Sequence, residues 1–254
     1  MSENVVISRA DRVMTLELAR TDKKNALTKD MYRSLSVAMH EADADPDVRV
    51  ILIHGQEDCF TAGNDLSDFL DPEDSLDDMG AGNFISVIPT VKTPIVAAVG
   101  GPAVGIGTTM LLHCDIVFAA TNARFVLPFI NLAVVPEAAS TMLLPKLAGH
   151  QKACELLLLG EPFDATVALA LGLATRVVEP SELLSSARAM AKTLASKPPA
   201  AMLATKALLK REPENVLQRI QEENAVFETR LASPEAQEAM SAFFEKRKPD
   251  FSKF

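Results

Sequence analysis

The sequence has no excess of basic residues, because its 34 Asp and Glu residues outnumber its 25 Lys and Arg residues. The formal net charge is −9 and the isoelectric point is near 5.0. Nucleic-acid-binding domains and polybasic membrane anchors both need a basic face, so the composition argues against either class. An anionic ligand would have to be bound by local hydrogen-bond donors.

Long apolar runs and paired cysteines are also missing. No apolar stretch reaches the roughly 18 residues that a membrane-spanning helix needs, and the opening "MSENVVISRA" lacks the pattern of a secretory signal. The three cysteines, Cys59, Cys114 and Cys154, are widely spaced and odd in number. This favours buried thiols in a reducing compartment over a disulfide framework. We therefore expect a cytoplasmic protein without membrane or nucleic-acid partners.

Several cofactor and catalytic motifs are absent as well. The glycines do not follow the dinucleotide-binding pattern G-x-G-x-x-G, there is no Walker lysine, and no serine lies in a G-x-S-x-G elbow. The four histidines, His40, His54, His113 and His150, have no metal-ligand spacing, so structural roles are expected for them. We expect no metal and no resident cofactor.

The hydrophobic pattern predicts strands alternating with helices from the start of the chain to about residue 150. With 48% hydrophobic residues, the 254-residue chain can bury a large core. Alternating apolar residues in "VVIS" and "RVMTLEL" predict a hairpin, and Thr28 is expected to cap a helix over 27–45. Further apolar strands are expected at 48–55, 93–101 and 115–120. Strands that are apolar throughout predict a parallel sheet covered on both faces.

After about residue 150 the pattern becomes helical, through "KACELLLLG", "DATVALALG", "PSELLSSARAMAKTLAS" and "PPAAMLATKALLKRE" to one long segment at 214–248. We expect an α/β core at 1–195 and a helical C-terminal region at 196–254. The acid-rich "DFLDPEDSLDD" (68–78) is expected to be a surface loop, and residues 68–90 are expected to form a wall of the ligand pocket.

Three short segments could carry chemistry. In "CFTAGNDL" (59–66), Gly63 lets the backbone bend so that the next amide points outward. In "GGPAVGIG" (100–107), glycines lead into a helical stretch whose N-terminus offers unpaired amides to a developing anion. In "NLAVVPEAAS", the lone acid Glu137 follows an apolar run. It either caps the helix that follows or is a general base whose pKa an apolar pocket raises.

In this order and spacing, "CFTAGNDL", "GGPAVGIG", "HCDIVFA" and "RFVLPFINLAVVPEAAS" resemble the crotonase superfamily, the enoyl-CoA hydratase/isomerase family. The resemblance extends from about residue 5 to the C-terminus, where "AMSAFFEKRKPDF" is similar to the family's closing helix. It implies an α/β fold, a spiral of ββα units with a C-terminal helical trimerisation region. It also implies an acyl-CoA thioester as ligand and a homotrimer, or a dimer of trimers, as assembly.

The resemblance implies roles for individual residues. The backbone amides of Asn64 and Ile106 would form an oxyanion hole for the thioester oxygen. Thr109 and Phe129 replace the two glutamates that hydratases of the family use, which argues against simple hydration because that reaction needs a base and an acid. The Pro-Glu pair ending at Glu137 resembles the peroxisomal type of Δ3,Δ2-enoyl-CoA isomerase, in which this glutamate is the catalytic base.

The expected ligand contacts also come from the resemblance. They are Asn25, Ala26, Leu27, Ala62, Gly63, Asn64, Asp65, Leu66, Gly105, Ile106 and Phe129. The segment 62–66 would line the pantetheine, and 25–27 would lie near the adenine. The basic run Lys246, Arg247 and Lys248 either meets the CoA phosphates or is a solvated helix end.

The expected reaction is isomerisation. Glu137 would take a proton from C2 of a 3-enoyl-CoA and return it to C4, while the two amides hold the dienolate oxygen. Two alternatives remain open: another reaction on the same scaffold, such as hydration or a dienoyl shift, and a non-catalytic acyl-CoA-binding protein. A poised base such as Glu137 argues against the binding protein, which has little need of one.

Overall fold

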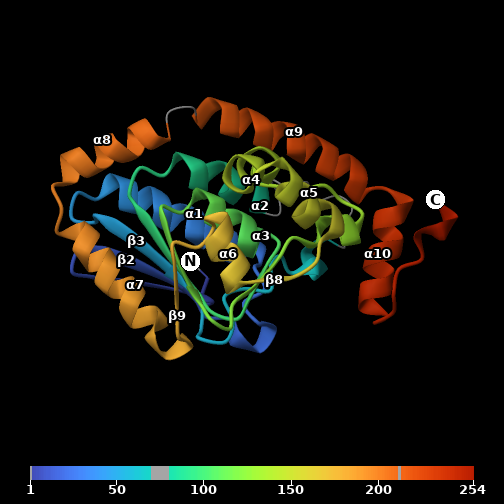
Figure 1. Ribbon diagram of the computed structural model, residues 1–254, viewed down its shortest axis with the longest axis horizontal. Coiled ribbons are helices and arrows are strands. Elements are labelled where there is room, and N and C mark those ends of the chain that lie inside the picture. The colour runs from blue at the N-terminus through green and yellow to red at the C-terminus, as the bar shows by residue number, and fades with distance from the viewer. Residues whose placement is uncertain (1, 70–79, 211–212) are drawn as a thin grey trace.

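A computed structural model describes residues 2–69, 80–210 and 213–254 of the chain. The expected surface loop at 68–78 lies almost wholly outside these residues, as does part of the expected pocket wall at 68–90. Figure 1 shows a sheet-containing body, with α8 and α9 running across its top and α10 at one end.

The centre of the protein is a six-stranded sheet with the strand order β1-β2-β3-β4-β6-β9. Its strands are β1 (Val5–Ala10), β2 (Val13–Leu18), β3 (Val50–His54), β4 (Ile95–Val99), β6 (Ile116–Ala120) and β9 (Arg176–Val178). The first two pair antiparallel, and every other neighbouring pair is parallel. Strands β3 and β4 are buried along their whole length, because both sheet faces are covered. The predicted hairpin and parallel sheet are confirmed.

A smaller second sheet carries the loops that build the site. It has the order β5-β7-β8, with β5 (Pro102–Val104), β7 (Arg124–Val126) and β8 (Phe163–Asp164). Each of β4 and β6 is followed by a strand of this sheet and then by a helical turn, α3 (Ile106–Thr109) or the 3-10 helix η5 (Pro128–Leu132). The chain after β3 also reaches the second sheet, because Thr61 forms a β-bridge with Ala103 of β5. The segments after β3, β4 and β6 are therefore neighbours.

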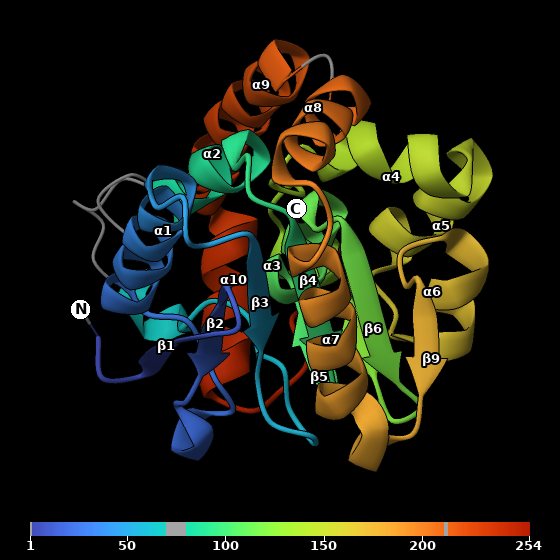
Figure 2. The same cartoon turned by 90° about the vertical axis from the view of Figure 1, so that its left-hand side faces the viewer.

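Helices cover both faces of the main sheet. On one face lies α7 (Pro180–Ala195), in front of the strands in Figure 2. Its buried residues Leu183, Ala187, Ala191 and Ala195 recur every fourth position, which gives it one apolar stripe of mostly small side chains. The opposite face packs α1 (Lys29–Ala44) and α2 (Ala81–Val87). As predicted, α1 is capped by Thr28, whose hydroxyl accepts from the Met31 amide.

The other helices connect and extend this core. They are α4 (Ser140–Ala148), α5 (His150–Leu159), α6 (Ala165–Leu171), α8 (Pro199–Leu209), α9 (Pro213–Leu231) and α10 (Pro234–Phe244). The 3-10 helices are η1 (Thr21–Lys23), η2 (Leu66–Phe69), η3 (Ile88–Thr90), η4 (Met110–His113), η5 (Pro128–Leu132) and η6 (Phe251–Lys253). The second glycine loop does lead into a helical stretch, made of α3 and then η4.

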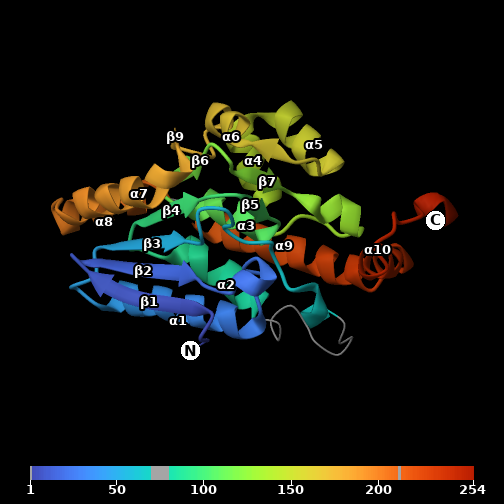
Figure 3. The ribbon, with the colours of Figure 1, turned by 90° about the horizontal axis from the view of Figure 1, so that it is seen from below.

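The prediction of one long C-terminal helical segment at 214–248 is wrong, because the chain breaks it into α9 and α10. Ser233 accepts from the Ala236 amide and Pro234 occupies the first turn, so a new helix begins there. Figure 3 shows α10 at the end of the molecule away from the main sheet. Ile220 and Phe227 of α9 are nevertheless buried in the same core as the sheet, so this region does not form a core of its own.

All three cysteines carry free thiols, but only Cys59 is buried, whereas Cys114 and Cys154 are partly exposed. The expectation of three buried thiols is therefore wrong for two of them. Across residues 2–69, 80–210 and 213–254, no helix combines the length and apolar composition needed to cross a bilayer.

Candidate active site

A cavity of about 650 Å³ opens where the segments after β3, β4 and β6 meet α9 and α10. Its wall is mostly apolar, and within the described residues its charged groups are Arg20, Lys23, Asp65 and Glu137. The lining residues are Arg20, Lys23, Ala26, Ala62, Gly63, Asn64, Asp65, Leu66, Ser67, Val104, Gly105, Ile106, Pro128, Phe129, Leu132, Val134, Glu137, Phe227, Leu231, Met240, Phe243 and Phe244. Apolar walls with a few placed polar groups are typical of small-molecule sites.

Asn64 lies on the wall of this cavity. The Leu27 amide donates to the Gly63 carbonyl at 2.8 Å, and the Asp65 amide donates to the Leu27 carbonyl at 2.9 Å. In a trans peptide the C=O and the following N–H point in opposite directions. Because the Gly63 carbonyl points toward Leu27, the Asn64 N–H points away from it, and no described residue accepts a hydrogen bond from it.

The turn at Gly63 requires glycine. Its φ is +88°, and a Cβ there would lie 2.7 Å from the Val104 carbonyl oxygen. The Thr61 hydroxyl accepts from the Gly63 amide at 3.0 Å and donates to the Asn25 carbonyl at 2.6 Å. The loop is therefore fixed on both sides, against β5 and against the segment before α1.

The second amide belongs to Ile106, the first residue of α3. The amides of Thr108 and Thr109 both donate to the Gly105 carbonyl, whereas the first residue of a helix has no acceptor within its own helix. No described residue outside the helix accepts from the Ile106 N–H. Two residues of the wall, Asn64 and Ile106, therefore have backbone amides without an acceptor in the described part of the protein. Amides of this kind can stabilise a negatively charged oxygen.

Most of the residues expected to contact a ligand line this cavity, and two do not. Those on the wall are Ala26, Ala62, Gly63, Asn64, Asp65, Leu66, Gly105, Ile106 and Phe129. Asn25 and Leu27 lie behind it and are 0% and 1% exposed. The Asn25 side-chain amide instead donates to the Phe60 carbonyl at 3.0 Å, so it supports the first loop.

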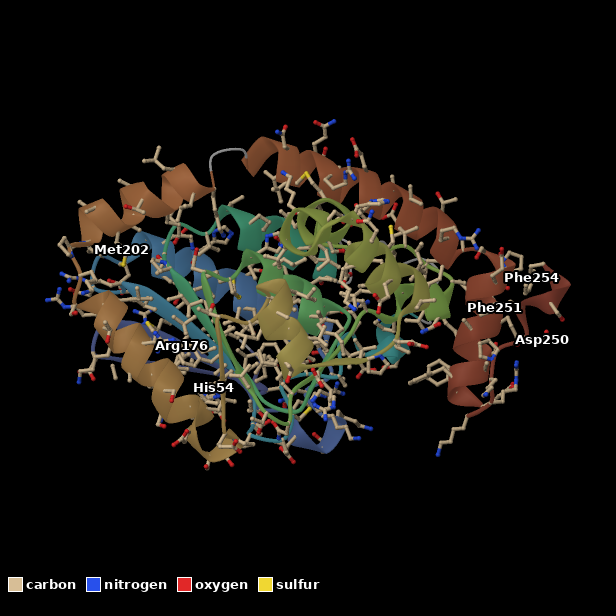
Figure 4. All side chains as sticks on the ribbon, viewed as in Figure 1. His54, Arg176, Met202, Asp250, Phe251 and Phe254 are labelled. Carbon is tan, nitrogen blue, oxygen red and sulfur yellow. The ribbon has the colours of Figure 1, made fainter. Side chains whose placement is uncertain are left out.

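The basic run at the C-terminus does not line the cavity. Arg247 is paired with Glu238 and Glu245, and the segment after it reaches the far end of the molecule, where Figure 4 labels Phe251. The cations on the wall are Arg20 and Lys23, which sequence reasoning missed. Both lie just before residues 25–27, the segment expected near the adenine, and this position could have identified them as candidates.

Glu137 lies on the wall almost without contact to solvent. It is 3% exposed, and its buried Oε1 has no hydrogen-bond partner in the described part of the protein. Burial, with a contribution from the negative charge of Glu223, raises the pKa of Glu137 from 4.5 to about 8. The next two residues, Ala138 and Ala139, have left-handed backbone conformations with φ of +59° and +55°. Residues other than glycine are disfavoured in this conformation. The contacts around Ala138 and Ala139 must therefore hold the segment in place.

Glu137 does not cap the following helix, so that alternative is wrong. The helix α4 begins at Ser140, and its N-terminal amides are taken by Glu223 of α9. Oε2 of Glu223 accepts from the Ala139 amide at 2.6 Å, and Oε1 accepts from the Thr141 amide at 3.0 Å. The side chain of Glu137 therefore takes no part in capping α4.

His113 holds the same segment from the other side. Its Nε2 lies 2.8 Å from the carbonyl oxygen of Ala138. Burial lowers the pKa of His113 to about 4, so the ring is neutral near pH 7 and donates this hydrogen bond from Nε2. Neither His113 nor Glu223 belonged to the predicted site, because nothing in the sequence connects them with Glu137.

The two positions where hydratases of the resembling family carry glutamates hold no carboxylate. Phe129 lines the cavity, and Thr109 is fully buried behind the wall with a hydroxyl that lacks a partner among the described residues. In residues 2–69, 80–210 and 213–254, no three His, Cys, Asp or Glu side chains are arranged to bind a metal ion.

Comparison with known proteins gives consistent matches. Residues 8–253 match the family model described as enoyl-CoA hydratase/isomerase. The probable enoyl-CoA hydratase echA8 of Mycobacterium bovis is 34% identical over 98% of each chain. Enoyl-CoA delta isomerase 2 of Rattus norvegicus is 32% identical over 98% of this chain and 65% of that protein. A crystal structure of an enoyl-CoA hydratase/isomerase from Pseudoalteromonas atlantica T6c has a TM-score of 0.94 at 40% identity, covering 98% of this chain and 100% of that chain.

These relatives include named hydratases and a named isomerase, so they define a scaffold and a ligand class rather than one reaction. The spiral of strand-strand-helix units, expected from the motifs, is confirmed by the match to the crystal structure. The chain has the crotonase fold and belongs to the enoyl-CoA hydratase/isomerase family.

Proposed function

We propose that this protein is a Δ3,Δ2-enoyl-CoA isomerase. The observation that carries the proposal is the position of Glu137, whose buried Oε1 has no hydrogen-bond partner among the described residues. It lies on the same cavity wall as Asn64 and Ile106, whose amides have no acceptor in that part of the chain. A base close to an oxyanion site is the minimum that proton abstraction beside a thioester carbonyl requires.

The proposed mechanism uses one carboxylate twice. Glu137 removes a proton from C2 of a 3-enoyl-CoA, and the electrons move onto the thioester oxygen, which the amides of Asn64 and Ile106 stabilise. The protonated Glu137 then delivers its proton to C4, which forms the 2-enoyl-CoA and restores the carboxylate. The raised pKa suits both steps, because a general acid and base works best when its pKa is near the working pH.

Hydration is the second candidate, because several relatives, including echA8, are named as hydratases. Adding water needs a base for the water and an acid for C2. Among the described wall residues, the other carboxylate is Asp65, which is bound to Arg20 at 2.6 Å. Burial acts to raise its pKa, but hydrogen bonds from Ser67 and Arg20 outweigh this and lower it, so Asp65 is a poor proton donor. This supports isomerisation over hydration.

Acyl-CoA binding follows from the same cavity. We propose that the apolar wall takes the acyl chain and pantetheine, and that Arg20 and Lys23 supply positive charge near the CoA phosphates. The resemblance further predicts a homotrimer, or a dimer of trimers, in the cytoplasm, and sedimentation of the purified chain would test the assembly.

The deciding experiment compares wild type with Glu137→Gln in the conversion of 3-hexenoyl-CoA to 2-hexenoyl-CoA, with crotonyl-CoA hydration followed in parallel. Isomerisation that the substitution abolishes, with little hydration by either protein, would support the proposal. Rapid hydration by wild type would favour the hydratase, and tight acyl-CoA binding without turnover would favour a binding protein.

A further inference from the structure

A second buried carboxylate lies next to the proposed base. Glu223, in the middle of α9, is 5% exposed and does not line the cavity. Its oxygens accept three hydrogen bonds, from the amides of Ala139 and Thr141 and from the Thr141 hydroxyl. These donors belong to the two residues around the start of α4, immediately after Glu137 in the chain. Glu223 is thus bound to the backbone that carries the base.

The hydrogen-bond environments of the two carboxylates differ sharply. Three donors stabilise the ionised form of Glu223, whereas Oε1 of Glu137 has no partner in the described part of the protein. When two neighbouring carboxylates compete for one proton, the better-bonded one ionises first. Glu223 therefore ionises before Glu137, and Glu137 is the group that takes up and releases a proton beside it.

The charge of Glu223 is not neutralised by a direct ion pair in the described residues. Arg219, one turn earlier on α9, donates to the Thr141 hydroxyl at 3.3 Å and pairs with Glu222 at 3.0 Å instead. Burial raises the pKa of Glu223, and the positive charge of Arg219 acts against this rise. Arg219 does not cancel the field of Glu223 at Glu137, since Glu223 still raises the pKa of Glu137.

The groups facing Glu137 from other elements do not cancel this field either. His113 of η4 is neutral near pH 7, and the ammonium of Lys210, the residue after α8, donates to the His113 carbonyl at 2.9 Å. Arg20 on the cavity wall is paired with Asp65, and the other cation among the described wall residues is Lys23.

We propose that Glu223 is a positioning residue for the proposed isomerisation, which fixes the backbone behind Glu137 and whose negative charge makes Glu137 a stronger base. This inference rests on the proposed function for its catalytic meaning. Its physical content, an electrostatic coupling between two buried carboxylates, holds whatever reaction the site performs.

A purely structural role for Glu223 would be that of a helix cap. A cap needs acceptor oxygens but no charge. Glu223→Gln removes the charge and keeps one of the two acceptor oxygens, so its loss of capping is read from the melting temperature and its loss of charge from the pKa of Glu137. Glu223→Asp retains the charge on a shorter side chain. Glu222→Gln removes the same charge from the neighbouring, half-exposed position on α9 and is the matched control.

The test is a titration of the Glu137 carboxyl by carbon-13 NMR of glutamate-labelled protein, with the resonance assigned from Glu137→Gln. We expect Glu223→Gln to lower the pKa of Glu137 from about 8, and Glu223→Asp and Glu222→Gln to leave it close to the wild-type value. An unchanged pKa in Glu223→Gln would overturn the proposal, even with a lowered melting temperature. If Glu223→Gln fails to fold, a pKa near 8 in Glu223→Asp supports the proposal, and an ordinary glutamate pKa there overturns it.

The same variants give a kinetic readout. In Glu223→Gln, the acid limb of the kcat/KM profile for 3-hexenoyl-CoA should move to lower pH, and the plateau should fall roughly three- to tenfold because a weaker base abstracts the proton more slowly. A uniform loss at all pH values, with no shift, would overturn the proposal. If Glu137→Gln retains isomerisation, the proposed function fails, and the NMR titration still decides whether the carboxylates are coupled.

Discussion

The two halves of the candidate site are built in different ways. The oxyanion half, formed by Asn64 and Ile106, consists of backbone amides that neighbouring backbone and a glycine turn hold in place. The acid-base half is one side chain, Glu137, whose environment comes from Glu223 and His113, far away in the sequence. A donor made of backbone tolerates changes of side chain, whereas the basicity of a buried carboxylate depends on every charge and donor near it.

The largest effect should come from breaking the acid-base half alone. Glu137→Gln keeps the size of the side chain and both amides but cannot accept the C2 proton. We expect kcat for 3-hexenoyl-CoA to fall by roughly 10²- to 10⁴-fold with little change in KM. Steady-state kinetics measure both constants, and a rise in KM that accounts for the whole loss would contradict the assignment of Glu137 as base.

Breaking the oxyanion half should reduce the rate almost as much. In Gly63→Ala, the new Cβ meets the Val104 carbonyl in a left-handed turn, so the loop must move and take the Asn64 amide with it. We expect a loss in kcat of roughly 10²- to 10³-fold and a loss in unfolding free energy of about 1–3 kcal/mol.

The matched control for that variant is Gly149→Ala. Gly149 also has a positive φ, +79°, but no atom lies within 4 Å of its Cβ position and it does not line the cavity. It should lose stability in chemical denaturation without losing kcat. Equal losses of kcat in both variants would show that strain, rather than a displaced amide, reduces the rate.

The cost of keeping Glu137 buried should appear as a pH-dependent stability difference. Its folded-state pKa of about 8 lies above the ordinary 4.5, so the folded protein holds a proton that the unfolded chain has already lost. The contribution of Glu137 to the free energy of unfolding is fully present below about pH 4.5 and is lost as the pH rises through about 8. Glu137→Gln cannot ionise, so above pH 8 it should exceed wild type in stability by on the order of a few kcal/mol.

Urea denaturation of both proteins at about pH 4 and about pH 9 would measure this difference. The two proteins should be similar at the lower pH, where both side chains are neutral. A constant difference at both pH values would mean that Glu137 titrates as an ordinary exposed glutamate.

The smallest effect should come from the cations at the cavity wall. Lys23→Ala should raise KM for an acyl-CoA by roughly two- to fivefold and leave kcat unchanged, because exposed charge pairs contribute little. Arg247→Ala, which removes a cation already paired with Glu238 and Glu245, should change neither constant. If Arg247→Ala raised KM and Lys23→Ala did not, the C-terminal basic run would be the contact for the CoA phosphates.

The sequence carries enough information to predict the parts of this site that glycine and local pattern specify. Gly63 marks the turn before one amide, and the glycines at 100–107 mark the helix start that provides the other. The parallel strands were predictable because their apolar runs are continuous. The sequence marks Glu137 as a candidate, but its two interpretations could not be separated, since the decision depends on which carboxylate reaches the α4 amides.

The environment of the base was not predictable for a related reason. Glu223 lies in a helix rich in acids and bases, and nothing local distinguishes it from the exposed Glu222 beside it. The break between α9 and α10 was missed because Ser233 and Pro234 interrupt a segment whose helical pattern continues on both sides. The interactions that matter here join elements far apart in the chain.

The contribution of α9 to the site also sets an order of events during protein synthesis. A ribosome adds about 5–20 residues per second, and N-terminal parts generally fold first. The strands, both free amides and Glu137 itself emerge before α9 and its Glu223. On a nascent chain the segment after Glu137 therefore lacks the carboxylate that caps α4. The base acquires its final surroundings only when α9 docks, so the site matures after the sheet that supports it.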